Sequence, residues 1–306
     1  NGYLGFVGRS ETWTITKNAQ ISEVLPAAVI GDTAFATLAE ALAAAKEGDT
    51  VKLLADAGVD QLVLTSGVKL DLNGYDLTAD YIVAFDGNDH VIGFNVCHDC
   101  CTFNDDAGTI YCCQRDWSKR GTVIEHNYVE HCCWDNRIAP NAAVWCHNAD
   151  GTLFQYNEVC YTHGVQDGQA FDIDISCNDT TIRYNYSHDN AGGFLLLMYR
   201  TRNNDIHHNI SEYDRNGLIW NHENDGGTRI HDNLFYLGME DVQVFRGPFD
   251  SDDWVFENNT FYAPEPNTEI EWRPRAKYNG NNYYNIKTLP DDPNARCEKP
   301  DFSPSR

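Results

Sequence analysis

An asparagine that returns at nearly regular intervals constrains the fold of this chain more than any other feature of its sequence. Each copy stands between two short apolar runs, as in LFQYNEVCY and TIRYNYSHD. A unit of this kind cannot bury its own apolar face, so successive units must stack into a β-solenoid. The aligned residues are Asn127, Asn157, Asn185, Asn209, Asn233, Asn259 and Asn282, and subtraction gives intervals of 30, 28, 24, 24, 26 and 23.

The repeated asparagines are predicted to be structural. In a stack each one lies above the previous one, so their side-chain amides can hydrogen-bond along the stack and satisfy buried polar groups. Asparagine also tolerates the left-handed backbone conformation that a tight corner needs. We therefore expect an asparagine ladder along one corner of the solenoid.

A third apolar run follows each pair, and these runs predict three strands in each coil. They are AVWCH, AFDIDIS, FLLLM, GLIWN, VQVFR and EIEWR. Near the start, TLAEALAAA (37–45) has the apolar spacing of an amphipathic helix, and a helix can cover the open end of a solenoid. We expect the solenoid over 27–288 and a non-repetitive exit segment over 289–306, and we place nothing over 1–26.

The formal charge of −24 limits the partners of the chain. So acidic a surface repels nucleic acids and anionic membranes, and no basic patch offsets it. The sequence lacks the run of roughly eighteen apolar residues that a membrane-spanning helix needs, and no signal peptide is visible. We expect neither nucleic acid nor membrane as a partner.

Eleven cysteines are present, and ten of them lie between Cys97 and Cys177. The segment CHDCC suggests a metal site, but its spacing fits no standard zinc pattern. The alternative is a stack of small buried thiols with one or two disulfides. The second interpretation is favoured, and no metal site is predicted.

The chain resembles the right-handed parallel β-helix proteins of the pectate-lyase-like superfamily over about 27–295. The resemblance rests on the opening TLAEALAAAKEGDTVKLL, the asparagine repeats and the closing NNYYNIKTLPDDPNA. The chain is also similar to carbohydrate-active β-helix proteins of gut and soil bacteria, in which segments like GQAFDIDISCNDTTIRYNYSHDNAGGFLLL occur. The resemblance implies an all-β, single-stranded right-handed parallel β-helix with a short N-terminal capping helix. It also implies an extracellular or cell-surface protein.

Most members of this superfamily are polysaccharide lyases or glycoside hydrolases, and a minority are tail spikes, epimerases, esterases and adhesins. Fold alone therefore does not decide the function. Pectin-hydrolysing members carry Asn-Thr-Asp, Asp-Asp, Gly-His-Gly and Arg-Ile-Lys on successive coils. Here FDIDIS occupies the corresponding kind of strand, and the other three motifs are absent. The resemblance implies a carbohydrate groove but assigns no catalytic residue.

Two aspartates in AFDIDIS are the main candidates for catalysis. Alternation along the strand turns Phe171 and Ile173 toward the core and Asp172 and Asp174 outward. The two aspartate Cα atoms are then about 6.6 Å apart. Their carboxyl groups can reach either separation that glycosidases use, roughly 5–5.5 Å for retention and 6.5–9.5 Å for inversion. Two close carboxyl groups favour one protonated and one ionised acid, as hydrolysis requires.

Aromatic side chains along the third strands are predicted platforms for sugar rings. Trp145, Tyr199, Trp220 and Trp272 are the candidates, and for GLIWN the opposite phase would turn Ile219 and Asn221 outward instead. The full set of predicted substrate-binding residues is Trp145, His147, Asp167, Asp189, Tyr199, Arg200, Trp220, His222, Arg246, Glu271 and Arg273.

His188 is a further candidate catalytic residue, in a turn at the edge of the expected groove. The sequence Ser187-His188-Asp189 cannot form a nucleophilic triad, because neighbouring strand side chains point to opposite faces. A polar corner without chemistry explains the same residues.

Three alternatives to hydrolysis stay open. The outward aspartates could belong to a merely solvated face. A lyase could use calcium held by Asp167, Asp172 and Asp174, with an arginine or histidine as the base. A glycan-binding spike or adhesin is the third, because FLLLM is apolar on both faces and could form a subunit interface, as in a trimer. We expect a glycoside hydrolase acting in an open groove, with no required cofactor, Ca2+ as an option, and either a monomer or a trimer.

Overall fold

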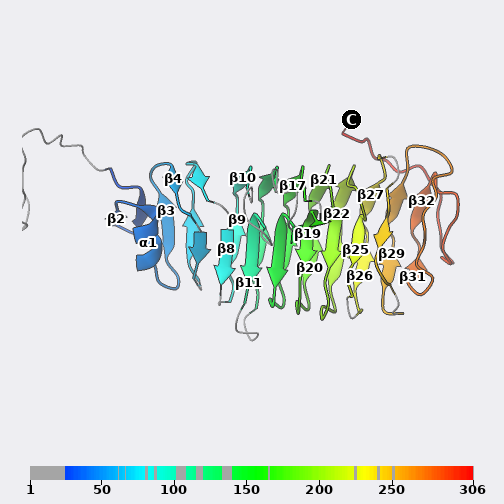
Figure 1. Ribbon diagram of the computed structural model, residues 1–306, viewed down its shortest axis with the longest axis horizontal. Coiled ribbons are helices and arrows are strands. Elements are labelled where there is room, and N and C mark those ends of the chain that lie inside the picture. Colours follow the sequence, from blue (N-terminus) through cyan, green and yellow to red (C-terminus); the bar gives the residue numbers. More distant parts are fainter. Residues whose placement is uncertain are drawn as a thin grey trace, which may run out of the picture.

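The computed structural model is a parallel β-solenoid, as the repeats predict (Figure 1). It describes residues 25–305 with interruptions at 61, 66, 80–81, 86–87, 101–107, 115–119, 133–139, 165, 224–225, 240–241 and 250–251. Each complete coil contributes one strand to each of three parallel sheets, which we call sheets 1, 2 and 3 in chain order.

The three sheets contain eight strands each. Sheet 1 consists of β9 (Val91–Gly93), β12 (Val123–Glu125), β16 (Leu153–Gln155), β20 (Thr181–Arg183), β23 (Asp205–His207), β26 (Arg229–His231), β29 (Val255–Glu257) and β31 (Lys277–Asn279). Sheet 2 consists of β10 (Val96–His98), β13 (Tyr128–Glu130), β17 (Glu158–Cys160), β21 (Tyr186–His188), β24 (Ile210–Glu212), β27 (Leu234–Tyr236), β30 (Thr260–Tyr262) and β32 (Asn282–Tyr284). Sheet 3 consists of β5 (Leu62–Leu64), β8 (Ile82–Phe85), β11 (Ile110–Cys113), β15 (Val144–His147), β19 (Gln169–Ile173), β22 (Gly193–Leu197), β25 (Ile219–Asn221) and β28 (Phe245–Arg246).

Strands of three residues suffice because only the middle side chain of each has to enter the core. In sheet 1 the buried middle residues are Ile92, Ile124, Phe154, Ile182, Ile206, Ile230, Phe256 and Tyr278. The registers place them directly above one another. The flanking residues of each strand point outward, which is the period-2 pattern of a strand with one buried face. The core is therefore a column that every coil extends by one layer.

The asparagine ladder is confirmed and runs along the corner between sheets 1 and 2. The Nδ2 of each asparagine donates to the Oδ1 of the next, at 2.8–3.1 Å. Its members are Asn95, Asn127, Asn157, Asn185, Asn209, Asn233, Asn259 and Asn281. The predicted last member, Asn282, was wrong by one position, and Asn95 was missed. The left-handed backbone was predicted for the asparagine, but it belongs to the residue before it, for example Tyr184 with φ 55°.

The predicted helix is α1 (Leu38–Ala44), and it covers the N-terminal end of the solenoid (Figure 1). Thr37 caps it in a capping box, because its hydroxyl accepts from the Glu40 N–H and the Glu40 carboxylate accepts from the Thr37 N–H. The helix packs on β1 (Ala28–Ile30), β2 (Thr33–Phe35) and β3 (Thr50–Leu53).

The N-terminal coils are incompletely joined to the rest. Strands β2, β1, β3 and β6 (Lys69–Asp71) form a four-stranded sheet of their own, and β4 (Ala57–Gly58) pairs only with β7 (Leu77–Thr78). Sheet 3, in contrast, continues from β5 through β8 into β11. The strand ladder is thus broken on two of the three faces between β6–β7 and β9–β10.

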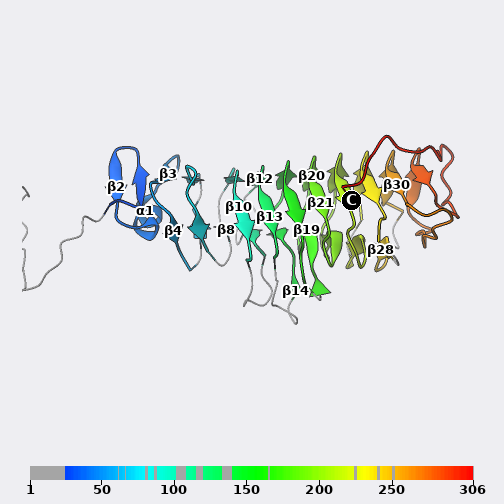
Figure 2. The ribbon, with the colours of Figure 1, turned by 90° about the horizontal axis from the view of Figure 1, so that it is seen from above.

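The C-terminal end departs from the prediction. The run EIEWR (269–273) does not form a strand, and β28 is the last strand of sheet 3. The exit segment then packs back over sheet 2 (Figure 2). Asp292 accepts hydrogen bonds from Asn281 and closes the ladder, while Phe302 packs against Tyr236 and Tyr262.

Cys112, Cys146 and Cys177 are buried in the core and form no disulfide bond. Cys112 and Cys146 are neighbours in adjacent coils, and Cys146 is followed by Cys177. Burial raises the pKa of the Cys112 thiol to about 12. These residues match the buried-thiol interpretation, whereas the last residue of the segment CHDCC, Cys101, lies outside the described residues. Across the described parts of the chain, no helix is long and apolar enough to cross a membrane.

Candidate active site

One row of side chains on the outer face of sheet 3 forms the centre of the candidate site. Strand register places five residues side by side across adjacent coils. This outer row consists of Trp145, Asp172, Leu196, Trp220 and Arg246. Parallel strands lie about 4.8 Å apart, so neighbours in the row are in contact distance. The predicted outward phase of Asp172 is the one that the structure has.

The two aspartates occupy adjacent outward positions, as expected. Asp172 is the next-to-last residue of β19, and Asp174 follows directly after the last one, where its N–H donates to the Cys146 carbonyl at 3.0 Å. His147, at the end of the neighbouring strand, places Nδ1 2.7 Å from Asp174 Oδ2. The structure therefore joins a predicted catalytic residue to a predicted substrate-binding residue.

The outer row is far less accessible than an open groove would be. Asp172 is 4% exposed, Asp174 7% and Leu196 0%. The FLLLM run is likewise buried within the single chain, so it does not offer the exposed apolar surface that a subunit interface would require. The expectation of an open groove along these strands needs correction: the carboxyl groups lie in a covered site.

The tryptophans do not present open ring faces to a sugar. Trp145 is 6% exposed and stacks on Tyr111 with 4.1 Å between ring centroids. Trp220 is 8% exposed, and the Arg246 guanidinium lies 3.6 Å from its ring centroid. Trp272 packs among core rings. The faces of these three rings are thus covered by neighbouring side chains.

Asp167 lies beside the candidate site on a separate short sheet. Its strand β18 (Gln166–Asp167) pairs with β14 (Pro140–Asn141), which projects from the solenoid next to β19 (Figure 2). Asp167 has a φ of 65°, and a single residue, Gly168, separates it from β19. It is thus a third carboxylate on the same coil as Asp172 and Asp174.

His188 is not in a turn but ends β21, on the outer face of sheet 2. Its Nδ1 lies 2.9 Å from Asp189 Oδ2, and its Nε2 lies 3.4 Å from Glu158 Oε1. Its ring stacks on Tyr186. These contacts tie His188 and Asp189 to sheet 2, whereas the predicted aspartate pair belongs to sheet 3, so the prediction of His188 as a groove residue is not supported by its surroundings.

The other predicted binding residues divide by position. His222 is exposed next to Trp220, with 5.9 Å between ring centroids. Tyr199 and the exposed Arg200 follow β22, with the guanidinium 5.8 Å from the tyrosine ring. These residues surround the end of sheet 3 that adjoins sheet 1.

Glu271 and Arg273 lie beyond the last strand of sheet 3. The Glu271 side chain is 82% exposed and pairs with Arg273 at 3.3 Å. Arg273 also donates to the carbonyl of Phe245 at 2.5 Å. Arg273 thereby holds the end of β28, and its role in substrate binding stays a prediction.

A buried carboxyl group between sheets 2 and 3 was missed. Asp214 accepts from Ser187 Oγ at 2.6 Å and Ser211 Oγ at 2.7 Å, and from the N–H and Nδ2 of Asn190 at 3.0 and 2.9 Å. Burial raises the pKa of Asp214, and the hydrogen bonds oppose this rise. The polar run SEYDRN was the signal that could have located this second polar ladder.

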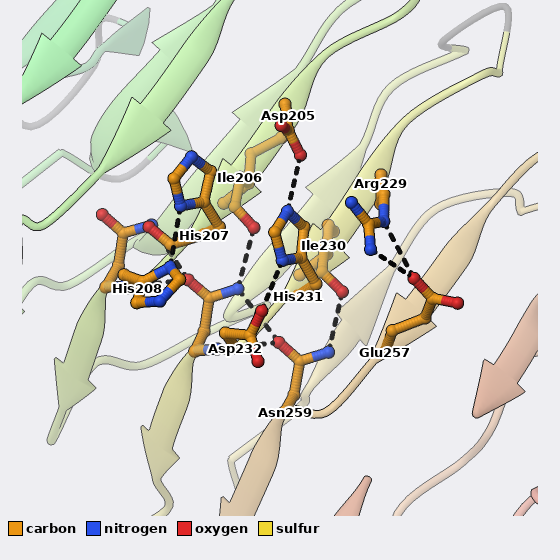
Figure 3. A network of polar contacts seen from close by, with 12 residues as sticks. Asp205, Ile206, His207, His208, Arg229, Ile230, His231, Asp232, Glu257 and Asn259 are labelled. Atoms are coloured by element: carbon orange, nitrogen blue, oxygen red, sulfur yellow. Dashed lines mark hydrogen bonds and ion pairs between the residues drawn. The ribbon is translucent and has the colours of Figure 1, made fainter. Parts of the chain in front are cut away.

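A second cluster of titratable groups lies on β23, β26 and β29 of sheet 1 (Figure 3). His231 contacts Asp205 Oδ1 through Nε2 at 2.8 Å and Asp232 Oδ2 through Nδ1 at 2.7 Å. His207 stacks on it at 4.9 Å and places Nδ1 2.8 Å from His208 Nδ1. Burial lowers the pKa of His207. Within the described ranges, no three His, Cys, Asp or Glu side chains are arranged to hold a metal ion.

Comparison with known proteins finds partial relatives. No family model matches the chain. The lacto-N-biosidase of Bifidobacterium longum subsp. longum is 31% identical over 197 residues, which cover 58% of this chain and 12% of that protein. Two crystal structures of GH136 lacto-N-biosidase from Eubacterium ramulus, of the native protein and of a selenomethionine derivative, align with TM-scores of 0.47 and 0.45. They share 18% and 19% identity, over 66% and 69% of this chain and 41% and 44% of theirs. The chain is thus similar to lacto-N-biosidases over part of its length and spans only a small part of the curated relative.

Proposed function

We propose that this chain belongs to a glycoside hydrolase that degrades an oligosaccharide, with Asp172 and Asp174 as its two catalytic carboxyl groups. The observation that carries the proposal is the placement of both aspartates on the outer face of sheet 3, with Asp174 held by His147. The 31% identity to a lacto-N-biosidase supports hydrolysis over elimination.

The neighbours of the two aspartates suggest their roles. With its proton on Nδ1, His147 donates a hydrogen bond to Asp174 and holds that carboxyl group in place. Asp174 is then the nucleophile or the base, and Asp172 is left as the general acid that protonates the leaving oxygen. Their burial excludes bulk water, which strengthens electrostatic interactions with a charged transition state.

The placement of the chain in the pectate-lyase-like superfamily, and an extracellular or cell-surface location, belong to the same proposal. Both follow from the resemblance of the repeats. The proposed function requires no cofactor. Activity before and after calcium chelation would test whether bound Ca2+ contributes. The lyase alternative would produce an unsaturated product that absorbs in the ultraviolet, whereas hydrolysis would produce only reducing ends.

The test is hydrolysis by Asp172→Asn and Asp174→Asn, beginning with substrates of lacto-N-biosidase. Each change should lower kcat by roughly 10²–10⁴-fold, as expected for loss of an acid or base. Asp167→Asn, on the same coil, determines whether the third carboxylate is also needed. Asp205→Asn, on sheet 1, is the matched control and should keep full activity. Full activity in both Asp172→Asn and Asp174→Asn would rule out the pair.

A further inference from the structure

A cleft opens where the strand ladder is broken, between the N-terminal coils and the first complete coil. Among the described strands, those of sheet 3 pair across this junction, through β8 and β11, while β6 and β7 do not pair with β9 and β10. The cavity measures about 1190 Å³, which exceeds the roughly 300–1,000 Å³ of small-molecule pockets. It has room for several sugar units and lies away from the outer row of sheet 3.

Phe94 presents an aromatic ring to this cleft. Its φ of 60° turns it out at the corner, and the residue is 74% exposed. One ring face stacks on His126, at 4.7 Å between centroids and 7° between planes. The stack continues through Tyr156 to Tyr184. Phe94 is the first ring of this stack, so its second face is turned toward the cleft that it lines.

The opposite wall adds a second ring and carboxylates. Tyr75, which is 39% exposed, lies in the turn between β6 and β7 and lines the same cavity. Together with Phe94, it bounds the cleft with aromatic surface on both coils. Carbon-bound hydrogens of a sugar ring pack well on such surfaces, whose faces carry partial negative charge.

The charged side chains that line the cleft determine which kind of ligand it suits. The residues that line the cleft include four carboxylates, those of Asp71, Asp76, Asp99 and Glu125, and one ammonium group, that of Lys69. Carboxylates accept hydrogen bonds from hydroxyl groups and repel anions. The lining therefore suits a neutral polyhydroxylated ligand and disfavours a polyuronate or a phosphate.

We propose that this cleft is a second carbohydrate site, which binds a neutral oligosaccharide with one sugar ring stacked on Phe94. The site is separate from the aspartates of sheet 3, so it would hold a glycan without cleaving it. The proposed function is thereby extended from hydrolysis of a glycan to binding of a glycan at a separate site. This second proposal does not depend on which residues are catalytic.

The experiment measures saturation-transfer NMR on the full chain carrying Asp174→Asn, a change chosen so that hydrolysis of the kind proposed above does not consume the probes. The probes are short cello-, xylo- and chito-oligosaccharides, with oligogalacturonate as the anionic arm. Phe94→Ala should weaken binding of the responding neutral oligomer about tenfold. Tyr184→Ala is the matched control, because Tyr184 belongs to the same stack but has Tyr156 on one side and His208 on the other.

The expected result is a neutral oligomer whose signal is lost in Phe94→Ala and kept in Tyr184→Ala, with no signal from oligogalacturonate. Binding that survives Phe94→Ala would place the sugar elsewhere, for example on sheet 3, and would overturn the proposal. A stronger signal from oligogalacturonate, or no signal from any neutral oligomer, would overturn it as well. None of these outcomes depends on whether Asp172 and Asp174 hydrolyse a substrate.

Discussion

His147 Nδ1 lies 2.7 Å from Asp174 Oδ2, although 27 residues separate them in the chain. The contact exists because β15 and β19 are neighbours in sheet 3 and both side chains follow the same outward direction. One coil of the solenoid thus orients a carboxylate that belongs to the next coil. Catalytic geometry in this protein would depend on stacking as much as on any single turn.

His147→Ala should lower kcat by up to roughly 10²-fold, because a misplaced reacting group costs about that much. His147→Asn should recover part of the loss, since its Nδ2 can donate where the imidazole Nδ1 does. Steady-state kinetics across a range of pH would separate the loss of positioning of Asp174 from the loss of the imidazole itself. An alanine variant with unchanged kcat and an unchanged pH profile would contradict a positioning role.

Gly192→Ala should destabilise the coil that carries Asp167. A Cβ at Gly192 would overlap the carbonyl oxygen of Asp167 and the backbone of Gly168. Overpacking of this kind costs about 1–3 kcal/mol, which urea unfolding would measure. Gly58→Ala is the matched control, because its nearest contact would be the Thr78 carbonyl oxygen at an ordinary 3.8 Å. Equal stability of the two variants would contradict the expected overlap.

Asn185→Ala should remove one member of the asparagine ladder and leave buried partners unsatisfied. Asn185 accepts from the N–H and Nδ2 of Asn157 and donates to Asn209 and to the Phe154 carbonyl. The loss should be roughly 1–3 kcal/mol for each buried group left unpaired. Asn294→Ala, at an exposed position, should change the free energy of unfolding by less than about 0.5 kcal/mol. Similar unfolding midpoints for both would disprove the structural role of the ladder.

Asp292 should make stability depend on pH at the C-terminal end. Its burial opposes ionisation, but hydrogen bonds from Asn281, Gly280 and Tyr283 outweigh that effect and lower its pKa. Its unfolded pKa is about 3.9, so the stabilisation is fully present above that pH and is lost as pH falls through the lower folded value. Asp292→Asn should flatten this part of the stability curve, measured by melting temperature between pH 2 and 6. The neighbouring variant Asp291→Asn should leave the stability curve unchanged. Identical curves for the two variants would contradict the role of Asp292 at the end of the asparagine ladder.

Much of the fold could be predicted because the repeated sequence pattern marks the strands and corners of each coil. The interval between asparagines, the three apolar runs and the helix at 37–45 all correspond to elements of the structure. The exceptions lie where periodicity is ambiguous: NGNNYY offers several asparagines at the last coil, and the spacing alone cannot tell that Asn281 continues the ladder. EIEWR alternates like a strand, but Trp272 turns into the core instead.

The candidate site was predictable in part. Alternation placed Asp172 and Asp174 outward, and stacking then made a contact with His147 reachable. The sequence could not decide which sheet receives a polar residue near a corner, because that depends on where the chain bends. For His188 the bend follows at Asp189, which has a φ of 59°, and this leaves His188 on sheet 2. The burial of the outer row depends on contacts between coils, such as Tyr111 on Trp145, which local patterns do not describe.

The break in the ladder between β6–β7 and β9–β10 has a mechanical consequence. In a stacked protein, stability is approximately a sum of the terms within each coil and those between neighbours. The junctions from β9–β11 to β26–β28 are closed by strand pairing in all three sheets, whereas this one is closed by sheet 3 alone. The N-terminal coils should therefore separate from the rest of the solenoid more easily than any other coils. A ligand bound between β6–β7 and β9–β10 would oppose that separation.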